Sequence, residues 1–161
     1  MSDNKITVKK DNFGDLLNIL KTLGEKQILV GVIEDKTARR EGEETNASIL
    51  YKNTVGSPLE RIPPRPLLEP AIEANKEKIG KQFRKVISNA LLGKAENLEK
   101  DLAHIGSTGE MVVKKWFDDP QNNWAPNSPY TIRMKGSDSP MIDTGQLRQS
   151  IHYAVRNKQN D

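Results

Sequence analysis

The chain contains no cysteine and no long apolar run, and only 5% of its residues are aromatic. Without cysteine it has no disulfide bonds, no thiolate nucleophile and no thiolate metal ligand, which is typical of proteins assembled in a reducing cytoplasm. No stretch reaches the roughly 20 apolar residues of a membrane span. The start of the chain lacks the basic and apolar blocks of a signal peptide. We therefore expect a protein made in the cytoplasm, with no membrane partner.

Neither sign of charge dominates, since 25 Lys and Arg residues oppose 22 Asp and Glu residues. The two signs are interspersed, whereas nucleic-acid-binding modules usually gather basic residues on one face beside aromatic platforms. We therefore do not expect sequence-specific nucleic-acid binding, although the basic stretch at residues 76–85 permits passive contact with DNA. The apolar share of 35% predicts a thin core, so that part of the order comes from neighbouring subunits.

The motifs of catalysis and metal binding are also missing. His104 and His152 belong to no H-E-x-x-H pattern, and the stretch at residues 106–109 lacks the lysine of a phosphate loop. No serine stands in a G-x-S-x-G elbow, and no calcium-loop spacing of carboxylates occurs. We therefore predict a protein that is not an enzyme and has no catalytic, cofactor-binding or metal-binding residues.

Hydrophobic periodicity predicts an α+β fold in a single domain over residues 1–161. Helices are predicted over residues 13–23, 72–91 and 98–116, and strands over residues 5–9, 27–33 and 151–155. The run at 27–33 is almost continuously apolar, which predicts a central strand buried on both faces. We expect a small antiparallel sheet packed against the two long helices, with Phe83, Val86 and Ile87 on one helix contacting Val112, Val113 and Trp116 on the other.

Two long segments lack such periodicity. Residues 34–46 are almost entirely polar, which predicts a mobile loop. Residues 118–142 contain four prolines, which block regular strand pairing, together with scattered aromatic and apolar side chains. We interpret this long loop as an assembly arm that lies on a neighbouring subunit. Its Trp124 either folds back onto the core or anchors a partner, and the sequence favours neither alternative.

Two shorter segments have a predictable backbone. The segment from Arg61 to Pro66 is predicted to be rigid and extended, and Ile62–Arg65 cannot begin a helix, because residues that precede proline are disfavoured in the α region. It is either a polyproline ligand for an adaptor domain or a stiff lead-in to the next helix, and the apolar residues that follow favour the lead-in. In Asp143-Thr144-Gly145, the side chains can satisfy nearby N–H groups and glycine permits a tight turn, which would aim the last strand into the sheet.

Three segments stand out together because of their order and spacing. They are Gly56-Ser57-Pro58 leading into Arg61–Ile72, then Asn123–Ser128 with Thr131-Ile132 and Lys135-Gly136, and finally Pro140–Ile151. In this order they resemble the phage virion morphogenesis family, which includes neck, tail-completion and minor tail components of tailed bacteriophages. With the intervening helices, the resemblance covers about residues 29–155.

The resemblance implies a structural virion protein: a neck or tail-completion subunit that forms a ring, a hexamer in this family, and joins the phage head to the tail. The implied partners are copies of the chain itself and the adjoining head-completion, connector and tail proteins, with DNA only passing through the channel. The implied location is the virion, after assembly in the host cytoplasm. The interface candidates are Arg61, Pro63, Pro64, Arg65, Pro66, Trp124, Pro126, Asp143, Thr144 and Gly145.

Other functions remain open on the sequence alone. A tail terminator or another minor tail protein would share the same resemblance. A DNA-associated phage accessory protein would use the basic stretch at residues 76–85, and salt-dependent DNA binding would identify it. A hydrolase with a dispersed site is the remaining class.

Overall fold

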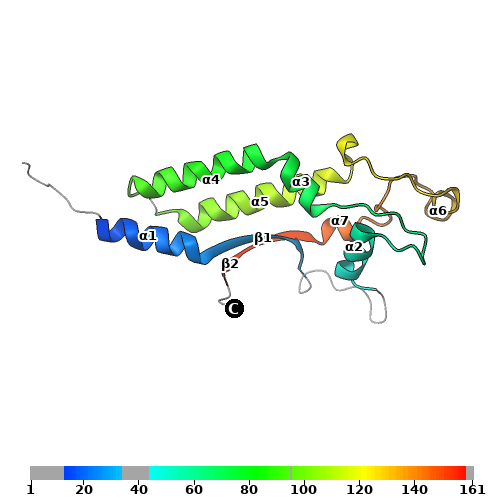
Figure 1. The fold of residues 1–161 in the computed structure, drawn as a ribbon, viewed down its shortest axis with the longest axis horizontal. Helices are drawn as coiled ribbons and strands as arrows, with labels where there is room; N and C mark the ends of the chain where they lie inside the picture. Colours follow the sequence, from blue (N-terminus) through cyan, green and yellow to red (C-terminus); the bar gives the residue numbers. More distant parts are fainter. Residues whose placement is uncertain (1–12, 34–43, 95, 159–161) are drawn as a thin grey trace, which may run out of the picture.

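The computed structural model describes residues 13–33, 44–94 and 96–158 of an elongated molecule (Figure 1). The elements are α1 Phe13–Glu25, β1 Lys26–Val32, α2 Asn46–Val55, α3 Leu68–Ala74, α4 Lys76–Leu91, α5 Leu98–Trp116, the 3-10 helix η2 Pro120–Asn122, α6 Pro129–Lys135, α7 Gln146–Gln149 and β2 Ile151–Asn157. The long helices α4 and α5 lie side by side, and α5 packs on the two-stranded sheet. The predicted α+β class, with an antiparallel sheet, is confirmed. Of the helices described, none is long and apolar enough to cross a lipid bilayer.

The sheet consists of β1 and β2, which pair antiparallel over their full length. A bond of 2.7 Å from the Lys158 N–H to the Glu25 carbonyl extends the ladder by one pair. Because bonded and non-bonded pairs alternate along an antiparallel ladder, every second residue from Lys26 to Val32 turns its N–H and C=O away from β2. No further strand pairs with β1 in the described part of the chain. The outer edge of β1 is therefore open there.

The prediction that β1 is a central strand buried on both faces is wrong. Its residues are only partly buried, and Leu29 is 37% exposed. The apolar run at 27–33 would suit a strand with other elements packed on both of its faces. In a sheet of only two strands, β1 is not enclosed in this way. The strand predicted at residues 5–9 lies outside the described residues.

The core is divided into two clusters along the long axis. The larger cluster gathers residues from α2, α3, α5 and the α7–β2 region: Leu50, Leu67, Ala71, Val113, Trp116, Phe117, Leu147 and Ile151. The smaller one joins Val86 of α4 to Leu102 and Ile105 of α5. Because α5 contributes to both clusters, it holds the two ends of the molecule together.

The helix α5 is continuous through Gly106 and Gly109, as predicted. Both glycines lie against the sheet. A Cβ atom at Gly106 would come within 2.3 Å of the Tyr153 ring, and one at Gly109 within 2.9 Å of Val30 Cγ2. The glycines therefore allow the helix backbone to approach the strands closely.

The other predicted long helix is divided into α3 and α4 at Asn75, whose φ of −112° departs from helical geometry. In the core, α4 meets the N-terminal half of α5 through Val86, whereas Val113 and Trp116 of α5 belong to the larger cluster. The predicted contact between the long helices is therefore wrong for most of its residues. Only Val86 of the α4 group is buried, whereas Phe83 and Ile87 are 38% and 42% exposed.

The two predicted loops differ in outcome. Residues 34–43 lie outside the described residues, and Asn46 already belongs to α2, which is capped by Thr45 Oγ1 accepting from the Ser48 N–H at 3.1 Å. The predicted loop at 118–142 contains η2 and α6. Ser128 Oγ caps α6 by accepting from the Thr131 N–H at 3.1 Å.

Candidate assembly site

The three segments that carry the family resemblance meet at one open cavity of about 840 Å³. It lies beside α2 and α7, at the end of the molecule that also holds α6 (Figure 1). Seven of the interface candidates line it: Arg61, Pro63, Arg65, Pro126, Asp143, Thr144 and Gly145. The fold thus brings together side chains from three distant parts of the sequence. We call this space the junction cavity.

The remaining candidates, Pro64, Pro66 and Trp124, do not line the cavity but support its wall. The Trp124 Nε1–H donates to the Pro66 carbonyl at 3.0 Å. The Trp124 ring meets Phe117 edge to face, with centroids 6.0 Å apart, and packs against the larger core cluster. Pro64 lies against Gly56, where a Cβ atom would come within 3.0 Å of the proline nitrogen. Of the two alternatives for Trp124, the structure therefore shows the one in which it folds back onto the core.

Arg65 is the central side chain of the cavity wall and is only 6% exposed. Its Nε and Nη2 donate to the Ala125 carbonyl at 3.1 and 2.8 Å. Nη2 also donates to the Pro126 carbonyl at 3.2 Å and to Asn127 Oδ1 at 3.4 Å. These acceptors are all neutral, and burial lowers the pKa of Arg65. The guanidinium therefore clamps residues 125–127 to the extended segment without an ion pair to any described carboxylate.

A second cation, Lys135 of α6, lines the same cavity. Its Nζ donates to the Ser139 carbonyl at 2.9 Å. Burial lowers the pKa of Lys135, the nearby carboxylate of Asp143 opposes this change, and the charge of Arg65 adds to it. At this wall the carboxylate of Asp143 therefore acts on Lys135, and Arg65 is a second cation close enough to affect the same lysine.

The backbone of the cavity wall is strained. Arg61 and Met141 line the cavity with φ of 55° and 59°, a left-handed conformation that is unusual for side chains of this size. The third described non-glycine residue with positive φ, Asn123, directly precedes Trp124. Such strain persists only where surrounding contacts impose it, and it concentrates at functional sites. The segments around the cavity are therefore held in a defined shape before any partner binds.

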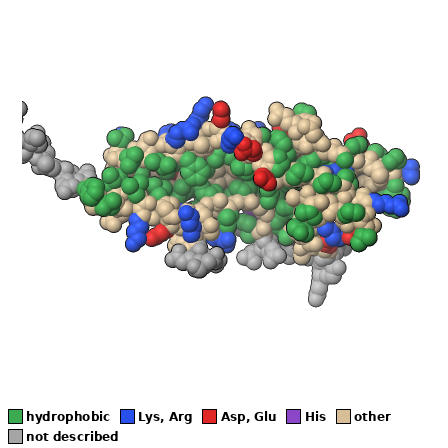
Figure 2. Space-filling model, in the orientation of Figure 1, with side chains coloured by type: hydrophobic (Ala, Val, Ile, Leu, Met, Phe, Trp, Pro, Cys, Tyr) green, Lys and Arg blue, Asp and Glu red, His purple; other side chains and the backbone are tan. Residues whose placement is uncertain are grey.

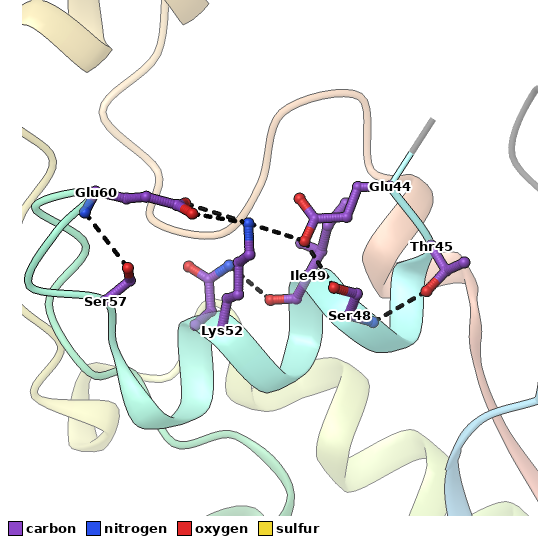
Figure 3. Close-up of polar contacts among 8 residues, drawn as sticks. Glu44, Thr45, Ser48, Ile49, Lys52, Ser57 and Glu60 are labelled. Atoms are coloured by element: carbon purple, nitrogen blue, oxygen red, sulfur yellow. Dashed lines mark hydrogen bonds and ion pairs between the residues drawn. The ribbon is translucent and has the colours of Figure 1, made fainter. Parts of the chain in front are cut away.

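A polar network fixes the α2 wall (Figure 3). Lys52 Nζ lies 3.0 Å from Glu60 Oε1 and 3.1 Å from Glu44 Oε1, and these carboxylates raise the pKa of Lys52. The Glu60 N–H in turn donates to Ser57 Oγ at 3.4 Å (Figure 3). The network therefore links the turn that precedes the proline segment to α2.

The same turn is closed by two reciprocal backbone bonds of 2.9 Å between Ser57 and Ile62. It projects Leu59, which is 98% exposed, into the solvent. The turn therefore has a fixed base and a free tip.

The predicted turn at Asp143-Thr144-Gly145 forms and leads into α7. Gly145 has φ of 79° at the helix start, and Thr144 Oγ1 accepts from the Gln146 N–H at 3.4 Å. Leu147 of α7 is 5% exposed and Ile151 at the start of β2 is fully buried. The turn thus directs the chain into the sheet, as expected.

A second feature was not identified from the sequence: an apolar band of exposed side chains on α1 and α4. We define it by Leu17 and Leu20 of α1, by Phe83, Ile87 and Leu91 of α4, and by Leu92 directly after α4, which are between 38% and 70% exposed. Figure 2 shows hydrophobic side chains in a broad band along the long axis, with charged residues along its borders. In the sequence, the helical spacing of the apolar α4 residues could have indicated this band, but that spacing was interpreted as a buried contact with the other long helix.

The described residues contain no cluster of three or more metal-binding side chains. His152 is the histidine closest to a carboxylate, with its Nδ1 3.9 Å from Glu110 Oε2. Comparisons with family models, curated proteins and solved structures find no match for this chain.

Proposed function

We propose that the chain is a structural subunit of a tailed-phage particle, a neck or tail-completion protein that forms a ring between head and tail. The family resemblance of residues 29–155 suggests this role. The convergence of its three segments on the junction cavity supports it, because segments that share a function are expected to share a place in the fold. We further propose that the protein is structural and not enzymatic.

The observation that carries the proposal is the apolar band. Single exposed apolar residues are ordinary, but a contiguous band with a charged rim is typical of a protein–protein interface. Burial of each Leu, Ile or Phe side chain contributes about 1.5–3 kcal/mol, so covering the band would contribute strongly to association. A protein that functions alone would gain nothing from leaving these side chains in water.

The open edge of β1 is a different kind of contact surface. Its unpaired N–H and C=O groups can accept a strand from another chain. The band and the edge lie on different elements and have different chemistry, so contacts between copies would pair unlike surfaces. Contacts of this heterologous kind generate rings when the rotation between copies closes.

A role in contacting DNA is supported by a separate observation on α4. Its basic side chains, Lys76, Lys78, Lys81, Arg84 and Lys85, are all exposed. In a ring these residues could face the channel through which DNA passes. Binding of the isolated protein to DNA that weakens with salt would favour the accessory-protein alternative.

The decisive experiment is electron microscopy of particles made without this protein. Full heads and separate normal tails would support a joining role. Overlong tails would identify a tail terminator instead, and normal joined particles would contradict both forms of the proposal.

A matched experiment tests self-assembly. The double substitution Phe83→Glu with Ile87→Glu places two charges in the apolar band and should abolish rings, as measured by light scattering. Leu59→Glu is the control, because Leu59 is more exposed than either residue but lies outside the band. Rings that survive the double substitution would rule out the band as the subunit interface.

A further inference from the structure

The charge of Arg65 is not balanced inside the protein. A buried arginine normally has a carboxylate beside it, because desolvating a charge is costly, and Arg65 as a residue is only 6% exposed. Arg65 instead donates only to carbonyl oxygens, through Nε and Nη2. Its Nη1 makes no hydrogen bond to any residue that the structure describes. Arg65, which lines the cavity, thus keeps one nitrogen without a described partner.

The other charges around the cavity do not remove this imbalance. Arg61 and Lys135 also line the space, whereas the lining carboxylates are Glu60 and Asp143. Glu60 is bound to Lys52 at 3.0 Å, so its charge is already paired. The cavity therefore presents an excess of positive charge to whatever enters it.

The remaining walls are apolar and extended. Ile62, Pro63 and Met141 contribute hydrophobic surface beside the cations. A cavity of about 840 Å³ accepts a few side chains of an extended segment. Because Arg65 is only 6% exposed, a single extended segment reaches it more readily than the wide backbone of a DNA duplex does. The mixture of cations and apolar walls fits a carboxylate next to an apolar side chain.

We propose that the junction cavity binds an acidic segment of a partner protein, with one carboxylate received by Arg65, Arg61 and Lys135. The inference rests on the proposed function, because it names the partner chemistry of the same assembly site. The strained conformations of Arg61 and Met141 hold the receiving walls in place. The segment adds no strand to the sheet; it supplies the missing countercharge.

The test uses the full chain and two blocked peptides, acetyl-Ala-Leu-Glu-Pro-Ala-amide and its Glu→Gln counterpart. Binding is followed by backbone amide NMR, and by the fluorescence of Trp124, which is bonded to Pro66 behind the wall. The Glu peptide should shift the amide signals of Ile62, Lys135 and Gly145. The Gln peptide should bind about ten-fold more weakly, since it lacks the charge that the cations receive.

Variants then assign the effect to the cavity. Lys135→Gln and Arg61→Gln should each weaken binding of the Glu peptide several-fold, whereas Lys85→Gln on the exposed face of α4 should not. Arg65→Lys keeps the charge but loses the planar guanidinium, so it should also weaken binding. This result counts only if the melting temperature of the variant is unchanged. Because Arg61 and Lys135 do not clamp residues 125–127, their variants keep the proposal testable if Arg65→Lys fails to fold.

Equal binding of the Glu and Gln peptides, or no shift at either peptide's solubility limit, would overturn the proposal. Saturation of the same amide signals by single-stranded DNA or inorganic phosphate, with no effect of the peptides, would overturn it in favour of a phosphate site. The peptide titration is repeated on the variant with Phe83→Glu and Ile87→Glu. If the unaltered protein binds the Glu peptide but forms no rings, only the proposed ring is refuted. If it forms rings but does not bind the peptide, only the proposed acidic-segment site is refuted.

Discussion

At the scale of single residues, Glu110 connects a helix to the edge of the sheet. Its Oε2 accepts from the Tyr153 N–H at 3.1 Å, on the side of β2 that faces away from β1, and its Oε1 accepts from Lys114 Nζ at 2.7 Å. Burial raises the pKa of Glu110, but the bonds to Lys114 and Tyr153 and the charge of His152 outweigh it, so the pKa is lowered. The carboxylate therefore contributes stability in its charged form.

The sign of this pKa change predicts how stability depends on pH. Because the folded pKa lies below the unfolded value, the contribution is present above the unfolded pKa and is lost as pH falls through the folded pKa. Glu110→Gln should therefore cost about 1–2 kcal/mol at pH 7 and clearly less at pH 3, as measured by denaturant unfolding. Glu99→Gln, at a carboxylate that is 82% exposed and paired with Lys26, is the control and should change stability little. An equal loss for Glu110→Gln at both pH values would contradict the pKa direction.

Trp124 gives a prediction that differs from the sequence interpretation of an assembly anchor. Its contacts with Phe117 and Pro66 lie within one chain. We now expect Trp124→Ala to lower the stability of the isolated subunit by about 2–3 kcal/mol, because a partly buried ring leaves a gap in the larger core cluster. Trp124→Phe, which loses only the bond to the Pro66 carbonyl, should cost about 1 kcal/mol. If Trp124→Ala left urea unfolding unchanged but weakened assembly, the indole of Trp124 would be shown to contact a partner.

At the scale of elements, α5 approaches the sheet closely at two glycines. Gly106→Ala would place a methyl group 2.3 Å from the Tyr153 ring, so we expect a loss of about 1–3 kcal/mol in thermal unfolding. Gly80→Ala in α4 is the matched control. Its nearest neighbour would be Arg84 Nη1 at 3.5 Å, so the change should stabilise the helix by about 0.5–1 kcal/mol. A neutral Gly106→Ala would show that α5 can move away from β2 without loss.

The elements show where sequence patterns suffice and where they do not. Local periodicity identified α1, α5 and β2. The signals for α6 were also present, because Ser128 precedes it, Pro129 is its first residue and Gly136 follows with φ of 69°. They were overlooked because the surrounding prolines suggested a continuous loop. By contrast, the break at Asn75 and the open edge of β1 depend on which element lies alongside, and that is decided by distant residues.

At the scale of the whole molecule, two core clusters predict unequal local stability. No residue of α1 is buried, and the smaller cluster contains only three buried residues. Hydrogen exchange in the isolated subunit should therefore be fastest in α1, slower in α4, and slowest in the C-terminal half of α5 and in β2. Uniform protection along the molecule would show that the clusters unfold as one unit.

The same measurement tests the arm interpretation of residues 118–142. Because Arg65 holds residues 125–127 in place through bonds to their oxygen atoms, the backbone N–H groups of Ala125 and Asn127 should exchange more slowly in the isolated subunit than those of a free arm. A further gain in protection on ring formation would still support a contact with a neighbour. Rapid exchange of the whole loop in the subunit would contradict the clamp.

The candidate site could be predicted only in part. The sequence supplied its members, because prolines, an Asp-Thr-Gly turn and a lone tryptophan are recognisable locally. The sequence could not predict that these residues lie together in the fold. The bond from Arg65 to the Ala125 carbonyl joins residues far apart in the chain, and no local pattern encodes such a bond. Nor could it separate Val86 from Phe83, because both follow the same helical spacing and only the position of α5 makes one buried and the other exposed.

The turn between Ser57 and Ile62 has a practical consequence for handling the protein. Its tip carries Leu59, fully in solvent, while reciprocal backbone bonds and the Lys52–Glu60 ion pair hold its base. A protease that cuts after exposed leucines should nick the chain there first. The two fragments should stay together in gel filtration and separate only in denaturant. An epitope or a fluorophore inserted beside Leu59 would therefore label the protein without disturbing its fold.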